Sequence, residues 1–505
     1  MNVHLKIKTT GSGFEVEGRH RGSLGRPIEP ARPGEDRQGI FAEWDWDGRR
    51  LEVRNDRYGL YPLFLYQGDE EIILSDSLSK VIELGAPREL DLDALAVFLR
   101  LQLFPGDDTP FRHVKQLPPS ARLAWTGKRA PVSSRRPVPE AVTLASDEAV
   151  GVYAELFRES VRRRLPLDDR QPILLPLSGG QDSRHILLEL LAQGRPPSRC
   201  VTIARDWSPK LLEDARVAAE LARAGGVPHV VLTRDKPLFE LETRKNELTN
   251  YGTLDHAWFL TLVDFLGESH GLVFDGLGGD ILSACILLHE NYLALYRQGD
   301  FARLADLFLG DETPCREALN PAFYASVGRD RAILRLAAEL ERHAGAVNPL
   351  TEFYFWNRTR RSTGLSPYSI LSRYATVESP FLDHDLFDFL IARPPEWLKD
   401  PSFHKRTIRA TYPRFAGIPF GDDSAPFAGS AAPYVAFARQ LSRALLRSPA
   451  DDLAMLRKRY VIPRLSRGLV DSKYALASAW LPQWVLYLSQ LGAIARDGVH
   501  SPALA

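Results

Sequence analysis

The spacing of apolar residues divides this chain of 505 residues into two parts. Over residues 1–130 apolar and polar side chains often alternate, as in segment 39–47 (GIFAEWDWD), and this alternation predicts strands with one buried face. Asp47-Gly48 predicts a hairpin turn before a strand at 51–53, and further strands are expected at 63–66 and 72–74. Helical spacing returns at 92–103. We therefore predict a β-rich N-terminal region.

A second pattern begins after a segment rich in Pro, Arg and Ser, 128–139 (KRAPVSSRRPVP), which we interpret as a linker. A helix is expected over 145–165. Strands are then expected at 172–177, 200–203, 229–232 and 272–274, with helices between them at 183–193, 212–224 and 255–267. Strands that alternate with helices predict the α/β class, with a doubly wound parallel sheet. Residues 285–505 read as mainly helical, so we predict two domains, 1–130 and 140–505.

The segment 178–183 (SGGQDS) lies between the first of these strands and its helix. Its two glycines let the backbone approach an anion, and the amides of the following helix face that anion. Ser178 and Ser183 add hydroxyl donors, and the carboxylate of Asp182 is a ligand type that Mg²⁺ prefers. No Lys follows the glycines, so this is not the loop of kinase-like NTPases. The segment predicts a phosphate site, the alternative being a plain Gly-Gly turn.

A second loop, 275–280 (DGLGGD), follows the last predicted strand. Ligands of such sheets bind at the carboxyl ends of the strands, so both loops are expected at one sheet edge. There Asp280 would face Asp182, and two carboxylates with phosphate oxygens are a common Mg²⁺ site. A Gly-rich turn with solvated aspartates is the alternative.

With these two loops the chain resembles asparagine synthetase-type enzymes of the ATP-pyrophosphatase class, whose motifs read S-G-G-x-D-S and G-x-G-x-D. Three other segments are similar to family motifs: 378–383 (ESPFLD), 405–409 (KRTIR) and 54–63 (RNDRYGLYPL). The resemblance implies an adenine nucleotide α-hydrolase-like synthetase domain that uses ATP and Mg²⁺. It also implies a preceding Ntn-hydrolase-like glutaminase domain. The implied metal ligands are Asp182 and Asp280, and the implied nucleotide site comprises Leu177, Ser178, Gly179, Gly180, Gln181, Asp182, Ser183, Val201, Gly276 and Gly278.

The N-terminal region departs from that family. Its glutaminase begins with a cysteine nucleophile directly after Met1, where this chain has Asn2, and no N-G-E-x-x-N segment occurs in residues 1–38. We therefore expect a truncated, inactive glutaminase domain. The expected activity is an ATP-dependent, AMP-forming amide-bond ligase or cyclase that adenylates a carboxylate without using glutamine. β-Lactam synthetases and lasso-peptide cyclases are similar to the enzyme expected here. The alternatives are ammonia-dependent amidation and a catalytically dead nucleotide-binding scaffold.

Five residues are candidates for the amide-forming step. Lys405 is expected near the pyrophosphate or acyl oxygen, with a solvated helix lysine as the alternative. Glu378, with Tyr374 or Tyr368, is an acid–aromatic pair that can deprotonate an amine, although a core ion pair would use the same glutamate. Lys473 lies where such cyclases place a lysine that stabilises the oxyanion.

Other side chains are candidates for contacts with the substrate. Arg358, Arg360 and Arg361 can bind a carboxylate or phosphate, or form a basic helix face. His256 and Trp258 are expected on a helix that faces the acceptor pocket.

The amino-acid composition limits the classes of binding partner that can be expected. The 64 basic and 64 acidic residues balance, which argues against nucleic acid or an anionic membrane as a partner. The three cysteines are few and have no metal-ligand spacing, and no signal peptide or membrane span is recognisable, so a cytoplasmic location is expected. The expected partners are a small-molecule or peptide carboxylate and an amine. A homodimer is left open.

Overall fold

The computed structural model describes residues 3–30, 36–204, 209–267, 271–284, 289–399, 402–421, 430–447 and 453–498. Its N-terminal part contains two antiparallel sheets of five strands each. The first has the order β2-β1-β7-β6-β8, and the second has the order β10-β9-β5-β4-β3. The bounds in the first sheet are β1 His4–Thr10, β2 Gly13–Gly18, β6 Phe64–Gln67, β7 Glu71–Ser75 and β8 Val114–Gln116. Those in the second are β3 Arg21–Ile28, β4 Gln38–Trp46, β5 Leu51–Asn55, β9 Ala121–Trp125 and β10 Ser133–Ser134.

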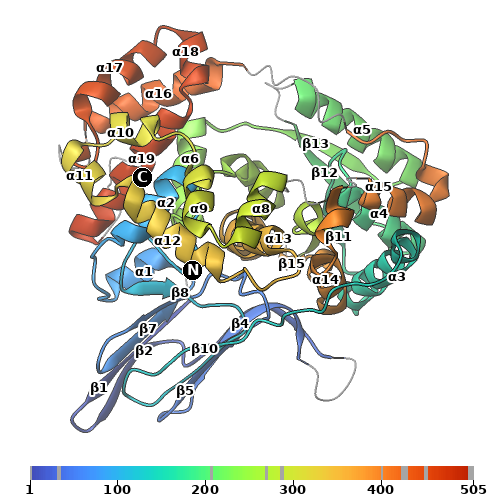
Figure 1. Cartoon of the computed structure of the whole chain (residues 1–505), viewed down its shortest axis with the longest axis horizontal. Helices are drawn as coiled ribbons and strands as arrows, with labels where there is room; N and C mark the ends of the chain where they lie inside the picture. Colours follow the sequence, from blue (N-terminus) through green and yellow to red (C-terminus); the bar gives the residue numbers. More distant parts are fainter. Residues whose placement is uncertain are drawn as a thin grey trace.

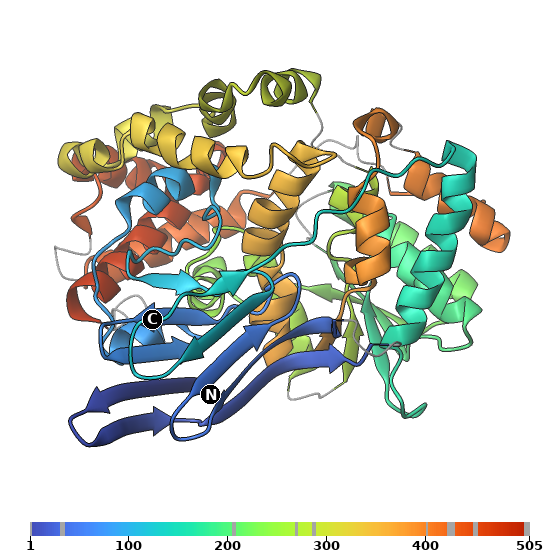
Figure 2. The same ribbon diagram turned by 60° about the horizontal axis from the view of Figure 1, so that its bottom comes forward.

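The two antiparallel sheets bury one face each in a shared apolar cluster, to which Ile7 of β1 and Trp44 of β4 belong. The other face of the first sheet carries Phe64 and Ile73, which join a second cluster with helices α1 (Leu78–Glu83) and α2 (Leu92–Leu101). The other face of the second sheet is polar, because outward positions of β5 such as Glu52 and Arg54 are exposed. Figure 2 shows these strands along one side of the molecule.

The third sheet is parallel and has the order β13-β12-β11-β14-β15. Its strands are β11 Ile173–Pro176, β12 Arg199–Ala204, β13 His229–Thr233, β14 Leu272–Phe274 and β15 Thr376–Glu378. The chain adds β12 and β13 on one side of β11, and β14 and β15 on the other. Such a reversal of strand order opens a crevice at the carboxyl ends of the central strands. The sheet therefore positions any ligand beside the ends of β11 and β14.

Helices surround this parallel sheet, as Figure 1 shows for α3, α4, α5, α14 and α15. The helices of its part of the chain are α3 Ser146–Arg164, α4 Asp182–Ala192, α5 Pro209–Gly225, α6 Leu238–Leu248, α7 Leu260–Leu266, α14 His384–Ile391 and α15 Phe403–Thr411. A short 3₁₀ turn, η1 (Ala257–Phe259), precedes α7, and η5 (Leu371–Arg373) precedes β15. Three segments are π-helical, a form found most often at functional sites: η2 Asp280–Ala284, η3 Phe355–Thr363 and η4 Ser366–Ile370.

Most of the remaining helices lie away from the parallel sheet in Figure 1, although α8 and α13 are drawn beside β15. The remaining helices are α8 Glu290–Gln298, α9 Phe301–Leu309, α10 Thr313–Ala318, α11 Pro321–Ser326, α12 Arg329–Glu341, α13 Pro349–Tyr354, α16 Ala432–Leu445, α17 Lys458–Gly468, α18 Ser472–Ala477 and α19 Trp480–Asp497. Their apolar faces build the second cluster together with α1 and α2.

The N-terminal sheets and the parallel sheet share a continuous core, since one apolar cluster runs through both. Ion pairs also cross the boundary: Arg57 pairs with Asp388, and Arg26 Nε lies 3.3 Å from Glu378 Oε1. The N-terminal region is therefore packed against the rest of the chain as part of the same core.

The four predicted parallel strands and the helices between them are confirmed within a few residues. The elements that were not predicted include β1 to β3, α1, β8, β9, α6 and β15. The predicted helix at 255–267 begins later, because His256 has a left-handed backbone (φ 78°). The predicted linker also contributes Ser133–Ser134 as an edge strand. The division into domains at 130–140 stays a prediction.

Candidate functional site

The loop 178–183 leaves the end of β11 and is held by its own side chains. Ser183 Oγ accepts a hydrogen bond from the amide of Ser178 at 3.0 Å, and the two serine hydroxyls lie 3.1 Å apart. The amide of Gly179 donates to Asp214 of α5 at 2.8 Å. Because α4 begins at Asp182, the amides of its first turn lie beside this loop, as an anion site requires.

The second loop, between β14 and η2, lies against the first. A Cβ atom at Gly279 would lie 2.5 Å from the Asp182 carboxylate, and one at Gly276 would lie 3.0 Å from Asp182 Cβ. Only glycine leaves room for Asp182 at these positions. The sequence prediction that the two loops meet at one sheet edge is therefore correct.

Three carboxylates converge where the loops meet: Asp182, Asp275 and Asp280. Desolvation raises the pKa of Asp182 well above its ordinary value, and the neighbouring charges of Asp280 and Asp275 raise it further. Desolvation also raises the pKa of Asp275 to about 6. Among the described residues, no group donates a hydrogen bond to the buried Oδ1 of Asp182. Carboxylates so placed repel one another unless a cation lies between them, so the donor set fits a divalent ion such as Mg²⁺.

This cluster is not a complete metal site by itself, because the described residues contain no arrangement of three His, Cys, Asp or Glu ligands. Mg²⁺ usually keeps several ligands from water or phosphate and takes only one or two carboxylates from the protein. Asp182 and Asp280 would hold the ion, with phosphate oxygens completing its shell.

A buried histidine chain leads away from Asp182. His404 Nδ1 lies 3.4 Å from Asp182 Oδ1 and 2.7 Å from Ser283 Oγ. Ser283 donates its own proton to Gly279 O, so His404 Nδ1 must carry the hydrogen between them. Its Nε2 faces His185 Nδ1 at 3.0 Å. Burial lowers the pKa of His404 to about 3, so the imidazole is neutral and its Nδ1–H donates to Ser283, beside Asp182.

The loops line a pocket of about 350 Å³. Eight residues of the predicted site lie on its wall: Leu177, Ser178, Asp182, Ser183, Val201, Gly276, Gly278 and Asp280. His256 and Trp258 also lie on it, as predicted. Thr363 and Ser366, from the π-helices, complete the far side. Sequence reasoning missed these two hydroxyls, since no local motif connects them to the loops. Gly179, Gly180 and Gln181 belong to the loop but do not line the pocket.

Glu378, a predicted catalytic base, lies elsewhere. It is 3% exposed, and its carboxylate lies between Arg26 of β3 and Arg164 of α3, at 3.3 and 3.7 Å. Burial raises its pKa, and the two arginines lower it in part. The contacts are those of a core ion pair, which was the alternative interpretation of this residue.

The other candidates for the amide-forming step do not line the pocket either. Tyr374 ends η5 and packs against the main apolar cluster. Lys405 lies on α15, with Nζ 5.3 Å from the ring centre of Phe420. Lys473 is exposed on α18, which Figure 1 shows far from β11 and α4. The structure does not bring these three residues together.

The arginine cluster near residue 360 is used for packing. Arg360 donates to the carbonyls of Gly59, Gly106 and Leu117. Arg361 donates to the carbonyls of Phe104 and Asp108. Both side chains are buried against the N-terminal region and do not line the pocket.

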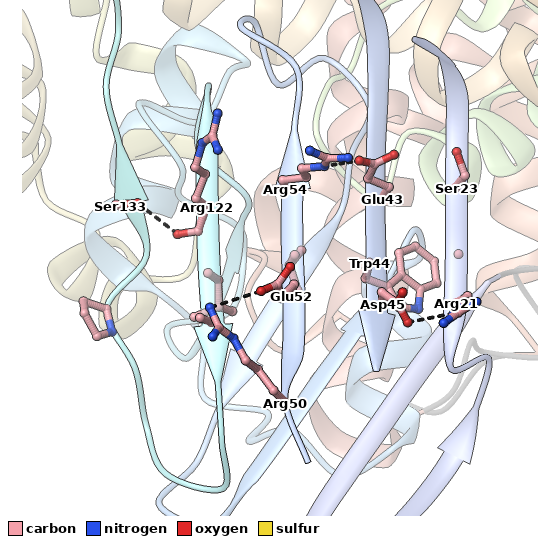
Figure 3. Close-up of a pocket in the computed structure, with 15 residues that line it drawn as sticks. Arg21, Ser23, Glu43, Trp44, Asp45, Arg50, Glu52, Arg54, Arg122 and Ser133 are labelled. Atoms are coloured by element: carbon pink, nitrogen blue, oxygen red, sulfur yellow. Dashed lines mark hydrogen bonds and ion pairs between the residues drawn. The ribbon is translucent and has the colours of Figure 1, made fainter. Parts of the chain in front are cut away.

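A larger hollow, of about 760 Å³, lies on the polar face of the second antiparallel sheet. Figure 3 shows its side chains in pairs: Arg21 with Asp45, Arg50 with Glu52 and Arg54 with Glu43. These charges are neutralised on the surface, and among the residues that line the hollow none is a cysteine or histidine. The hollow offers no nucleophile of the kind that glutamine hydrolysis requires.

Two family models match the chain. The glutamine amidotransferase domain model covers residues 34–134, and the asparagine synthase model covers residues 152–415, just over half of the chain. No helix within the described ranges is long and apolar enough to cross a membrane.

Matches to individual proteins are weaker. Proteins of Mycobacterium bovis and Mycobacterium tuberculosis named "Putative asparagine synthetase (glutamine-hydrolyzing)" are 28% identical over 201 residues, 38% of this chain and 30% of theirs. The chain thus matches less than a third of the length of these relatives. A solved glutamine phosphoribosylpyrophosphate amidotransferase from B. subtilis, complexed with ADP and GMP, covers 46% of this chain and 64% of its own. Its identity of 10% and TM-score of 0.16 are too low to bear on the fold.

Proposed function

We propose that this chain, which belongs to the asparagine synthase family, is a carbon–nitrogen ligase that activates a carboxylate with ATP and releases AMP. The observation that carries the proposal is the convergence of Asp182, Asp275 and Asp280 on the loop 178–183. An unneutralised carboxylate cluster beside the N-terminus of α4 is costly unless a cation and an anion bind there together. Mg²⁺ with a triphosphate supplies both.

In the proposed reaction, a substrate carboxylate oxygen attacks the α-phosphorus of ATP and pyrophosphate leaves. An amine then attacks the acyl carbon, AMP leaves with the bonding electron pair, and an amide forms. The role of this segment is electrostatic, since the amides at the start of α4 would face the charge that develops on the phosphates. Bound Mg²⁺ would neutralise the triphosphate, held by Asp182 and Asp280.

We further propose that the ligase does not hydrolyse glutamine. The three cysteines are Cys200, Cys285 and Cys315, so residues 1–199, which include the whole amidotransferase match, contain none. Burial raises the pKa of Cys200 and of Cys315 to about 12, which leaves both thiols protonated and unreactive. The amine would then come from solution or from the substrate itself.

We also propose how the two parts of the chain are classified by fold. The strand order β13-β12-β11-β14-β15, with helices between parallel strands, supports a doubly wound sheet of the nucleotide α-hydrolase type. The uncovered polar face of the second antiparallel sheet supports a glutaminase domain that has lost a layer. The partners would be a small-molecule or peptide carboxylate and an amine.

The test is ATP–pyrophosphate exchange with Mg²⁺ across a panel of carboxylates, comparing the native chain with Asp182→Asn. We expect carboxylate-dependent exchange that the substitution abolishes. ADP and phosphate as products would contradict adenylation. Measurable ATP binding without exchange for any acid would favour a nucleotide-binding scaffold.

A further inference from the structure

The charges on the pocket wall are all of one sign. Its described residues include Asp182, Asp214, Asp275 and Asp280, and none of them is a lysine or arginine. Asp214 accepts from the amide of Gly179, and Asp275 accepts from the amide of Leu277 at 2.8 Å. Mg²⁺ would balance the charges of Asp182 and Asp280 together with the triphosphate. No described group of the wall is then available to pair with a further anionic group on a substrate.

Buried arginines around the site do not fill this role, because they donate to main-chain carbonyls. Arg184 donates to Gly179 O, Ile418 O and Pro419 O, and Arg393 donates to Leu282 O. Arg360 and Arg361 bind carbonyls of the N-terminal region, as described above. These guanidinium groups fix the loops and helices that shape the pocket.

Other residues of the pocket wall are aromatic or carry hydroxyl groups. The rings of His256 and Trp258 lie 6.3 Å apart, and those of Trp258 and Phe259 lie 5.5 Å apart at 79°. His256 adopts a left-handed backbone, which persists for a non-glycine residue only where the surroundings impose it. Thr363 and Ser366 add two hydroxyl groups to this wall.

We infer that the acyl substrate carries its reacting carboxylate as its only negative charge and presents an aromatic or apolar body to His256, Trp258 and Phe259. This inference rests on the proposed function and narrows its substrate class. A dicarboxylate such as succinate would bring a second carboxylate next to the four on the described wall, without a lysine or arginine there to pair with it. The repulsion excludes such acids, while the aromatic wall attracts uncharged bodies.

The experiment measures ATP–pyrophosphate exchange for two sets of acids with Mg²⁺. The first set is 3-phenylpropanoate, cinnamate and hexanoate, and the second is succinate, glutarate and adipate. We expect kcat/KM to be at least about tenfold higher for the best acid of the first set. Trp258→Ala should raise KM for 3-phenylpropanoate about tenfold. Its matched control is Trp480→Ala, since Trp480 is also half-buried but lies on α19, outside the pocket.

Each other outcome overturns the inference. Exchange that is equal or faster with the dicarboxylates would refute it and still support adenylation, so the proposed function would stand. An equal response to Trp258→Ala and Trp480→Ala would refute the aromatic wall. Exchange with neither set would also refute the stated substrate class. In that case, loss of ATP binding in Asp182→Asn would separately show that the nucleotide site is real.

Discussion

Two hollows described above, one on the antiparallel sheet and one at the parallel sheet, differ in how their charges are neutralised. The one on the antiparallel sheet has about twice the volume, and its arginines pair with carboxylates along the surface, as Arg21 does with Asp45 at 2.9 Å. The one at the parallel sheet is smaller, and its carboxylates lie together without a cationic side chain on the described wall. Paired surface charges are near neutral in energy, whereas clustered, desolvated charges are costly unless a ligand neutralises them. Unsatisfied charge therefore marks a binding site better than volume does.

The largest difference between the two hollows is expected when an aspartate in each of them is replaced by asparagine. We expect Asp280→Asn to lower ATP–pyrophosphate exchange by at least about a hundredfold, because one of the two Mg²⁺ ligands is lost. Asp45→Asn, in the antiparallel hollow, should leave the rate within twofold. Similar rates for the two variants would show that the carboxylate cluster does not serve catalysis.

A second substitution separates packing from chemistry at Glu378. Glu378→Gln leaves Arg26 and Arg164 facing an uncharged group in the core, so we expect a loss of about 3 kcal/mol in the free energy of unfolding. Denaturant unfolding measures it, with the exposed Glu52→Gln as the matched control. If stability were unchanged while exchange disappeared, Glu378 would be the catalytic base after all.

The comparison also predicts a pH dependence. The pKa of Asp275 is about 6 when folded against an ordinary value of 3.8, so between these values the folded chain holds a proton that the unfolded chain releases. Without metal, this group therefore makes the protein more stable as pH falls from 7 towards 4, on the order of 1–3 kcal/mol. Mg²⁺ binds the deprotonated carboxylates. We expect it to raise Tm more at pH 7.5 than at pH 5, and the difference should shrink in Asp275→Asn. Equal increases in Tm at both pH values would contradict this.

The smallest effect is expected on the antiparallel sheet. Arg54→Ala removes an exposed partner of Glu43, which retains Arg37 at 2.5 Å. Its cost in unfolding free energy should stay within about 0.5 kcal/mol, and exchange should not change. A large loss of exchange would give this face a function that its paired charges do not suggest.

Much of the fold could be predicted from short sequence patterns. The parallel strands β11 to β14 are short apolar runs, and β11 and β14 end in glycine-rich loops, so their positions and their common edge could be predicted from the sequence. β15 could not, because Thr376–Glu378 is only three residues long and is defined by its pairing with β14. The strands before residue 30 carry many glycines and charged residues. They depend on partners distant in sequence, such as Leu5 with Leu74.

The candidate site likewise contains residues that could be predicted from the sequence and residues that could not. Asp182 and Asp280 lie in glycine-rich loops whose sequence indicates their chemistry. Thr363, Ser366 and the His404–Ser283 contact are assembled from helices more than 80 residues beyond those loops or from opposite sides of the pocket, and no spacing rule connects them. For Glu378 the motif predicted a catalytic role, but the folded chain pairs this residue with two arginines.

The contacts of Arg360 and Arg361 have a consequence for how this chain can change over evolutionary time. Both hold the N-terminal region through main-chain carbonyls, at Gly59, Gly106 and Leu117 among others. A carbonyl is present whatever the side chain, so these contacts depend on the backbone of that region, which Gly59 and Gly106 shape through their positive φ values. They hold η3, whose last residue, Thr363, lines the pocket. Deletion of the region would instead leave two buried guanidinium groups without acceptors. The sequence of the N-terminal region can therefore change more readily than the region can be deleted.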